Sequence, residues 1–165
     1  MLLIMKRLEE LNFSALMDIY IEGNLEKAEG YGDGGLLRAE REFYDYLRED
    51  FFRQKDAFYA VWQVAGRYVS ALRLEPYKDG WLLEALETAL ADRKKGYAKA
   101  LMTAVLDMMG DAVVYSHVSR RNEASLRTHY ACGFQKHLDH VVYLDGSVSD
   151  RAVTLRYSTK ELPLA

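Results

Sequence analysis

Apolar residues recur along the chain with two different spacings, which distinguish its helices from its strands. Over 95–109 they fall at intervals of three and four residues, which places them on one face of a helix. Phe43, Leu47 and Phe51 repeat every four residues and predict an earlier helix, and Asn12 is a candidate N-cap for the first one. Helices are therefore predicted directly after Asn12 and over 37–52, 95–109 and 122–131.

Segments rich in aromatic and β-branched residues predict the strands. Ala65-Gly66 is a tight turn between two of them, and the glycine-rich segment 30–35 is a loop. The run that begins at Trp81 is apolar on both faces except for two glutamates, which is typical of a central strand. Strands are predicted over 2–8, 58–63, 68–74, 81–90, 112–118, 140–144 and 152–157. No repeat or linker interrupts the elements, so residues 1–165 are predicted to form a single α/β domain.

The composition is that of a folded domain, with half of the 165 residues apolar and 28% charged. The most apolar long stretch, 98–115, carries three charged residues, so no membrane span is predicted. A net charge of −3 excludes a polybasic field, and no nucleic-acid partner is predicted. The single cysteine, Cys132, excludes an internal disulfide and a cysteine-based zinc site. The expected location is a reducing cytoplasm.

The segment 86–98 joins the central strand to the strongest helix and carries the first chemical signal. A helix N-terminus presents unpaired N–H groups and a partial positive charge, which together attract anions. Gly96 and Ala98 keep the turn free of bulk, and three nearby lysines add positive charge. The segment is either a phosphate-binding turn or a solvated basic loop. It contains neither a Walker loop nor the dinucleotide fingerprint G-x-G-x-x-G.

Two motifs make the chain similar to a known family, the GCN5-related N-acetyltransferase (GNAT) superfamily. Arg93-Lys94-Lys95-Gly96-Tyr97-Ala98 resembles its pyrophosphate loop, Gln/Arg-x-x-Gly-x-Gly/Ala. Asn122, Ser125, His129 and Gly133-Phe134 match the spacing of its second motif, one helix and one strand further on. The order of elements also agrees over nearly the whole chain. The resemblance implies the GNAT fold, a mixed central sheet flanked by helices in the order β-α-α-β-β-β-α-β-α-β-β.

The resemblance implies acetyl-coenzyme A (acetyl-CoA) as co-substrate, held where the fourth and fifth strands part. The backbone of 86–88 would pair with the pantetheine arm and hold the acetyl carbonyl, and the N–H groups of 94–99 would cradle the pyrophosphate. Asn122 would contact the cofactor arm. The implied cofactor-binding residues are Leu86, Glu87, Thr88, Arg93, Lys94, Lys95, Gly96, Tyr97, Ala98, Lys99, Asn122, Ser125 and His129. Neither a metal nor a redox cofactor is implied.

Acetyl transfer to an amine needs a neutral nucleophile, and three residues are candidates for the base that removes its proton. Glu84 and Glu87 lie inside an apolar run, where burial raises the pKa of a carboxyl group toward a useful value. Alternation along a strand predicts that they face opposite ways. His117 stands where some family members carry a catalytic glutamate, and it needs little tuning. As alternatives, either glutamate could form an ion pair with an arginine, and His117 could be a hydrogen-bonded histidine of the sheet. Glu84 acting through water is preferred, because it lies deeper in the run.

The resemblance also implies an acid that protonates the leaving thiolate. His129 occupies the position where the family most often has tyrosine, and it is expected near the thioester sulfur. Tyr130 follows directly, but one residue rotates a helical side chain by about 100°. His129 is therefore the candidate acid and Tyr130 the reserve, with an ordinary surface histidine as the alternative.

Together these observations predict transfer of an acetyl group from acetyl-CoA to a primary amine by direct attack. The alternative is a non-catalytic CoA-binding sensor or scaffold domain, because no single base is compelling. A third interpretation, transfer of a longer acyl group, depends on the space near 86–88. The acceptor stays open among small amines, antibiotics, amino acids and proteins. A homodimer through the last strands is a further possibility.

Overall fold

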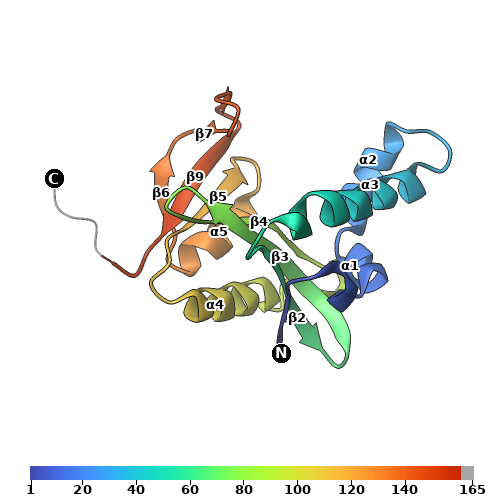
Figure 1. The fold of residues 1–165 in the computed structure, drawn as a ribbon, viewed down its shortest axis with the longest axis horizontal. Coiled ribbons are helices and arrows are strands. Elements are labelled where there is room, and N and C mark those ends of the chain that lie inside the picture. The colour runs from blue at the N-terminus through green and yellow to red at the C-terminus, as the bar shows by residue number, and fades with distance from the viewer. Residues whose placement is uncertain (161–165) are drawn as a thin grey trace.

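The computed structural model describes residues 1–160 and contains a sheet of seven strands (Figure 1). The spatial order is β1-β2-β3-β4-β5-β9-β6. Neighbouring strands are antiparallel except for β4 and β5, which run parallel. The prediction of a mixed sheet is therefore confirmed. The strands are β1 (Leu2–Met5), β2 (Phe58–Val64), β3 (Arg67–Tyr77), β4 (Gly80–Thr88), β5 (Val114–Ser119), β6 (Gln135–Leu138) and β9 (Ala152–Tyr157).

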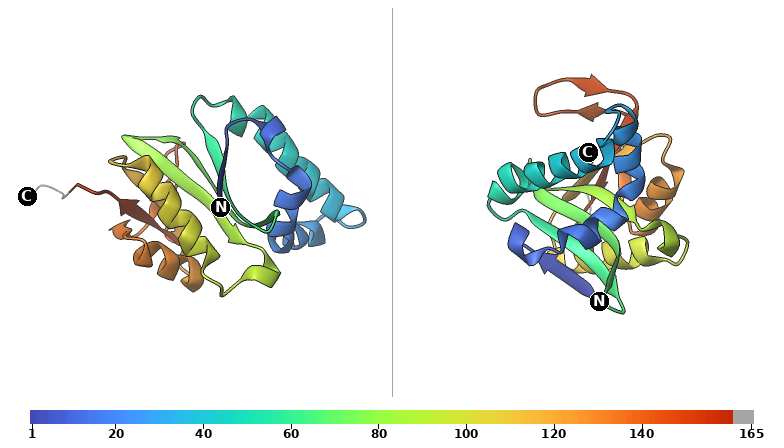
Figure 2. Two further views of the ribbon diagram at one scale, coloured as in Figure 1. Left: turned by 90° about the horizontal axis from the view of Figure 1, so that it is seen from below. Right: turned by 90° about the vertical axis from the view of Figure 1, so that its right-hand side faces the viewer.

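Helices cover both faces of this sheet (Figure 2). One face carries α4 and α5, and the other carries α1, α2 and α3. Asn12 caps α1 as predicted, because its side-chain oxygen accepts a hydrogen bond from the N–H of Ala15 at 3.1 Å. The predicted first helix is divided at Tyr20 into α1 and α2. The helices are α1 (Phe13–Ile19), α2 (Ile21–Glu29), α3 (Gly35–Glu49), α4 (Tyr97–Met109) and α5 (Glu123–Ala131), with short 3-10 turns at Leu8–Glu10, Phe51–Arg53 and Leu90–Asp92.

The sheet separates two apolar clusters. One lies beneath α1–α3 and includes the fully buried Leu16 and Tyr59. The other lies beneath α4 and α5 and includes Leu83 and Leu101. Each fully buried apolar side chain of this size contributes about 1.5–3 kcal/mol. Both clusters contain residues of β2, β3 and β4, so these strands are packed from both sides, whereas β5 contributes only to the second cluster.

A bulge interrupts β4 at Ala85, which has a φ of +56°. Glu84 pairs with Arg73 of β3 and Glu87 with Ala71, so two residues of β4 lie opposite one residue of β3. Cross-strand partners share a face, and so do residues two apart on β3. Glu84 and Glu87 therefore lie on the same face, beside α1–α3. The expectation that they face opposite ways is wrong, because the inserted residue shifts the alternation by one.

The strands β4 and β5 pair only at their beginnings. Trp81, Leu82 and Leu83 lie opposite Val114–Ser116, and beyond Leu83 the two strands separate. Of the remaining five residues of β4, Glu84, Glu87 and Thr88 pair with β3, and none of the five has a strand partner on the β5 side. The sheet thus opens into a wedge at its centre, between the predicted fourth and fifth strands.

The C-terminal third differs most from the predicted elements. The edge strand β6 was not predicted, because Gln135, Lys136 and His137 are exposed and show no apolar alternation. The predicted strand 140–144 shortens to β7 (Val141–Val142), which pairs with β8 (Val148–Ser149) in a small separate hairpin. The predicted strand 152–157 is present as β9, and it lies between β5 and β6.

Candidate functional site

A cleft of about 890 Å³ opens where β4 and β5 separate. It extends from the end of β4 across the first turn of α4 to the start of α5. Eleven of the thirteen predicted cofactor-binding residues line it, and Lys95 and His129 do not. The lining residues are Glu22, Leu86, Glu87, Thr88, Asp92, Arg93, Lys94, Gly96, Tyr97, Ala98, Lys99, Ser119, Arg121, Asn122, Ala124, Ser125, Arg127 and Thr128.

The first turn of α4 presents free donors to this cleft. The first intrahelical bond runs from the N–H of Ala100 to the carbonyl of Gly96 at 3.0 Å, so the N–H groups of the three preceding residues have no acceptor within the helix. Gly96 is the N-cap of α4 and adopts a φ of +82°, which glycine tolerates best. Lys94 is also left-handed, at +63°. This end of α4 is therefore suited to bind an anion.

An ion pair between a buried carboxylate and an exposed arginine fixes the loop that leads into α4. Asp92 is only 2% exposed, and its two oxygens accept hydrogen bonds from Arg67 of β3 at 2.9 and 2.8 Å. Lys95 lies 3.6 Å from the same carboxylate, which explains its absence from the cleft. The hydrogen bonds from Arg67 keep the pKa of Asp92 below its usual range. Nothing in the local sequence indicated this pair, since its members are 25 residues apart.

Arg93 and Glu87 connect the end of β4 to α2. Arg93 donates to the Glu87 carboxylate at 3.0 Å and to the Thr88 carbonyl at 3.2 Å, and it pairs with Glu22 of α2 at 2.9 Å. Burial raises the pKa of Glu87, and the nearby charge of Arg93 opposes that rise. The Arg93 side chain therefore forms ion pairs with two carboxylates, those of Glu22 and Glu87.

The second predicted motif forms the far wall of the cleft. Asn122 caps α5 by accepting the N–H of Ser125 at 3.1 Å, and both residues line the cleft. His129 is 1% exposed and points away, with Nδ1 at 2.7 Å from the Ser125 carbonyl and Nε2 at 2.9 Å from the Ser116 hydroxyl. Burial lowers the pKa of His129. Tyr130 is 47% exposed and does not line the cleft. The acid role assigned to these two residues stays a prediction.

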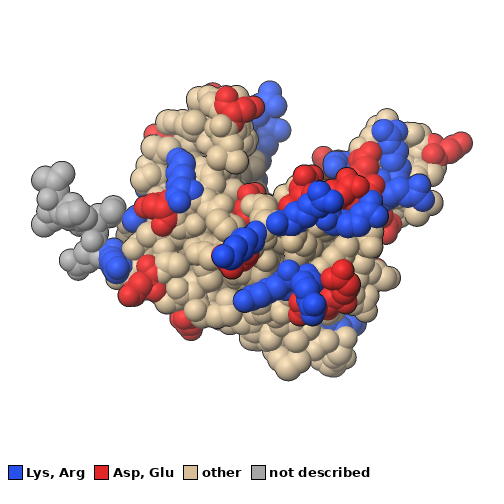
Figure 3. Space-filling view, viewed as in Figure 1, with Lys and Arg blue, Asp and Glu red and all other residues tan. Residues whose placement is uncertain are grey.

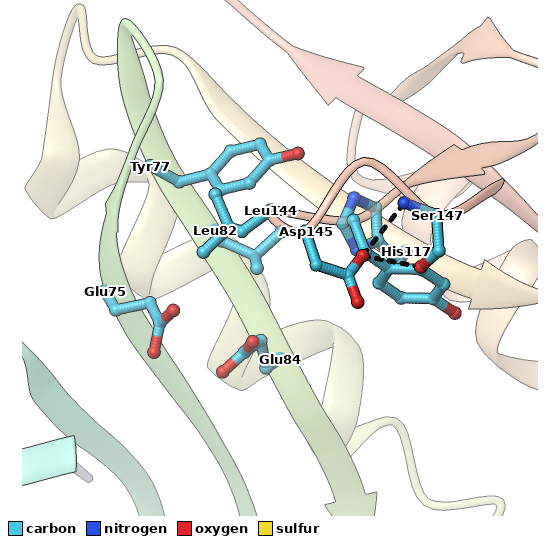
Figure 4. Close-up of a pocket in the computed structure, with 9 residues that line it drawn as sticks. Glu75, Tyr77, Leu82, Glu84, His117, Leu144, Asp145 and Ser147 are labelled. Carbon is cyan, nitrogen blue, oxygen red and sulfur yellow. Dashed lines mark hydrogen bonds between the residues drawn. The ribbon is translucent and has the colours of Figure 1, made fainter. Parts of the chain in front are cut away.

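A second cavity, of about 530 Å³, lies on the α1–α3 face of the same wedge (Figure 4). Figure 3 shows the molecule hollowed between the part formed by α2 and α3 and the part formed by β5–β9. The cavity brings together Glu84 of β4 and His117 of β5, two of the three predicted bases, whereas Glu87 belongs to the cleft. Its lining residues are Glu75, Tyr77, Leu82, Glu84, His117, Tyr143, Leu144, Asp145 and Ser147.

His117 lies edge-on between two tyrosines. Its ring centre is 5.7 Å from that of Tyr77 and 6.2 Å from that of Tyr143. Within residues 1–160 its Nε2 is shielded from solvent and has no hydrogen-bond partner. Burial lowers the pKa of His117, and the charge of Lys78 lowers it further. The imidazole is therefore neutral at pH 7, the form in which it accepts a proton.

Glu84 is held by an arginine enclosed in aromatic rings. Its carboxylate lies 3.3 Å from Nε of Arg73. The Arg73 guanidinium is 5.0 Å from the ring centre of Tyr46 and 5.7 Å from that of Phe51. Burial raises the pKa of Glu84, and the charge of Arg73 opposes it. Removing either partner would leave a half-buried charge unpaired.

A chain of two hydrogen-bonded tyrosine hydroxyls ends at the backbone of the β4 bulge. The Tyr20 hydroxyl donates to the Ala85 carbonyl at 2.6 Å, and the Tyr59 hydroxyl donates to Tyr20 at 2.9 Å. Both tyrosines are buried, and burial raises their pKa values above the ordinary range, so both stay protonated. No local sequence pattern indicated this chain, which joins the residue between α1 and α2 to β2 and β4 across long separations.

Comparisons with known proteins agree with this geometry. The sequence model of the acetyltransferase (GNAT) family matches residues 18–134, which include the cleft loop, β4 and β5. No curated protein matches the sequence. Within residues 1–160 no helix is long and apolar enough to span a membrane, and no group of histidine, cysteine and acidic side chains is arranged to hold a metal ion.

Solved structures resemble the chain over almost its whole length. Histone acetyltransferase HPA2 and related acetyltransferase from Corynebacterium glutamicum is 13% identical, with a TM-score of 0.70 and 99% of each chain covered. PaiA N-acetyltransferase from Thermoplasma acidophilum, in complex with coenzyme A, is 15% identical, with a TM-score of 0.67 over 96% of this chain and 99% of the other. The ribosomal-protein-S18-alanine N-acetyltransferase from Escherichia coli is 17% identical, with a TM-score of 0.59 over 100% and 99%. At these identities the likeness establishes the fold.

Proposed function

Because the chain belongs to the acetyltransferase (GNAT) family, we propose that it transfers the acetyl group of acetyl-CoA directly to a primary amine bound in the His117 cavity. One observation carries the proposal. The wedge between β4 and β5 has an anion-binding helix end in its cleft and a neutral, half-buried histidine in a cavity on its other side. A thioester in the wedge would lie between the two.

The residues of the cleft fit acetyl-CoA. The free N–H groups at the start of α4 suit the pyrophosphate, and Lys94, Lys99 and Arg127 add positive charge. The segment 86–88 of β4 has no strand partner on the β5 side, so its backbone is open to the amide groups of the pantetheine arm and to the acetyl carbonyl. Asn122 and Ser125 supply side chains on the opposite wall.

His117 is the proposed base. Its Nε2 is the shielded ring nitrogen without a partner, and its lowered pKa keeps it neutral at pH 7. An alkylammonium group must lose a proton before it can attack, and a neutral imidazole accepts that proton. Glu84, the base preferred from the sequence, is already paired with Arg73, and Glu87 is paired with Arg93.

The departing thiolate makes a smaller demand on the protein. The usual pKa of a thiol is about 8.5, far below that of an alkyl amine, so the C–S bond can break without an acid in contact with the sulfur. His129 and Tyr130 line neither cavity, and the proposal needs no contribution from them. In balance, an ammonium and a thioester give an amide, a thiol and one proton released to solvent.

Release of free thiol tests the proposal. With acetyl-CoA and a panel of primary amines, the protein should release thiol in an amine-dependent way, and mass spectrometry should find the amide product. His117→Ala should abolish most of this turnover and leave the binding of coenzyme A unchanged. Binding of coenzyme A without turnover on any amine would instead support the alternative, a non-catalytic sensor or scaffold domain.

Several properties stay predictions. A single domain over 1–165, a cytoplasmic location and a homodimer follow from the sequence and the resemblance only. The same holds for the preference for acetyl over longer acyl groups, which a comparison of acetyl-CoA with longer acyl-CoA donors would test.

A further inference from the structure

The cavity beside His117 is negatively charged. Three carboxylates line it, those of Glu75, Glu84 and Asp145, and within residues 1–160 its lining contains no lysine or arginine. Glu84 is compensated by Arg73. Glu75 accepts only a neutral hydrogen bond from the Gln54 amide, at 3.1 Å.

Asp145 is compensated by no cation either. Its Oδ1 accepts hydrogen bonds from the N–H of Ser147 at 2.9 Å and from the Ser147 hydroxyl at 2.6 Å. Among the ion pairs of residues 1–160, none includes Glu75 or Asp145. Two cations lie beside the cavity: Arg73, which is paired with Glu84, and Lys78, whose Nζ lies 5.3 Å from the ring centre of Tyr77. Two uncompensated carboxylates therefore face the space that an acceptor would fill.

The two uncompensated carboxylates lie apart from each other, with Asp145 beside Ser147 and His117 (Figure 4). Glu75 comes from β3, whereas Asp145 comes from the turn between β7 and β8. In this view Leu82 and Leu144 are drawn between them, and the ring of Tyr77 lies to one side. The cavity therefore offers negative charge, an apolar middle and negative charge again, with His117 on its wall.

A second feature also points to a bound group. Nε2 of His117 is shielded and unpartnered, although a buried ring nitrogen normally has a hydrogen-bond partner. A ligand that brings an N–H group into this cavity would supply the missing partner. Carboxylates alone would attract any cation, but the histidine restricts the choice to one with a transferable proton.

We propose that the acceptor is a linear diamine or polyamine, a chain of methylene groups that carries at least two ammonium groups. The inference rests on the proposed acetyl transfer. One ammonium stays charged beside a carboxylate and its methylene chain packs on the leucines and Tyr77. The other ammonium loses its proton to His117, and its lone pair attacks the acetyl carbonyl. The N–C bond forms as the C–S bond breaks, the electron pair leaves with sulfur, and the resulting thiolate takes up the second proton that the nitrogen loses.

Other acceptors match this cavity less well. A free amino acid would bring its carboxylate against Glu75 or Asp145. An aminosugar would place hydroxyl groups against Leu82, which is 6% exposed and offers them no hydrogen-bond partner. A simple alkyl amine would fill the apolar middle but would leave the second carboxylate unmatched.

The test compares 1,4-diaminobutane with butylamine, which has the same chain and one charge fewer. At saturating acetyl-CoA, kcat/KM should be at least about tenfold higher for the diamine, a difference of about 1.4 kcal/mol. Glu75→Gln and Asp145→Asn should each reduce that ratio and should not change the binding of coenzyme A. The control, Asp107→Asn, removes an exposed carboxylate of α4 outside both cavities and should leave the ratio unchanged. Added salt should weaken the diamine preference.

The outcomes separate this inference from the proposed function. Equal kcat/KM values for the two amines, or a preference for an aminosugar, an amino acid or a peptide N-terminus, would overturn the diamine assignment and leave acetyl transfer standing. Binding of coenzyme A without thiol release on any amine would overturn both. Melting curves confirm that each variant is folded. If one carboxylate variant does not fold, the other decides.

Discussion

Replacing Tyr20 by phenylalanine removes one hydroxyl group. This change should lower the kcat of acetyl transfer and should have little effect on the KM for acetyl-CoA. Tyr20 touches neither cavity, but its hydroxyl donates to the carbonyl of Ala85 at 2.6 Å. Ala85 has a φ of +56°, a conformation that costs an L-residue other than glycine about 1–2 kcal/mol. The hydrogen bond offsets a strain of similar size, so its loss should let the bulge relax.

The expected magnitude follows from the groups left without partners. In Tyr20→Phe the Ala85 carbonyl loses its donor and the buried Tyr59 hydroxyl loses its acceptor. Each unsatisfied buried group costs about 1–3 kcal/mol. If about 1.4 kcal/mol of this is lost from the transition state, kcat falls about tenfold. The KM for acetyl-CoA should change little, because the anion-binding turn of α4 is not involved.

The control is Tyr59→Phe, which deletes the outer hydroxyl of the same chain and keeps the Tyr20–Ala85 bond. Tyr59→Phe should lower the melting temperature about as much as Tyr20→Phe does, and each kcal/mol lost corresponds to roughly 2–4 °C. Its kcat should stay near that of the unmodified protein. Steady-state kinetics and thermal melts of both variants decide the matter. Equal kcat values for the two variants would show that the chain serves stability alone.

Three further outcomes are expected. Coenzyme A should raise the melting temperature of the protein. Gly96→Glu should abolish that shift, because it places a carboxylate at the free N–H groups of α4. The control Gly96→Asn should retain the shift, because asparagine tolerates a positive φ. The rate of acetyl transfer should rise with pH through an apparent pKa below about 6.5, because burial lowers the pKa of His117 and the base must be unprotonated. His117→Ala should remove this rising part of the pH–rate profile. A rise that instead follows the pKa of the amine would exclude His117 as the base. Arg67→Ala should lower the melting temperature at pH 7 by about 2–4 °C. The pKa of Asp92 is lower in the folded protein than in the unfolded chain, so the stability that the Arg67–Asp92 ion pair adds is fully present above the unfolded pKa of about 3.9. That stability is lost as the pH falls through the lower folded pKa. The melting temperatures of Arg67→Ala and of the unmodified protein should therefore converge in acid.

The cofactor cleft could be predicted because its residues lie close together in the sequence. A helix start after a basic turn has one geometry, and the N–H groups of α4 follow from it once Gly96 is placed as the N-cap. The acceptor cavity is different. Tyr77, His117 and Asp145 come from three segments with a long separation between each pair, and only the fold brings them together. The hairpin that carries Asp145 was itself predicted as a single strand over 140–144.

The bulge at Ala85 explains why the choice among the three bases could not be made from the sequence. A regular strand would turn Glu84 and Glu87 to opposite faces, and the nearer one would be the base. The inserted residue instead turns both to the α1–α3 face. Glu87 then meets Arg93 at the cleft, and Glu84 meets Arg73 beside the cavity. Both carboxylates therefore enter ion pairs, and the proton acceptor left without a partner is His117 on the neighbouring strand. Ala85 carries no sequence signal for this, because alanine rarely adopts a positive φ and does so here under the hydroxyl of Tyr20.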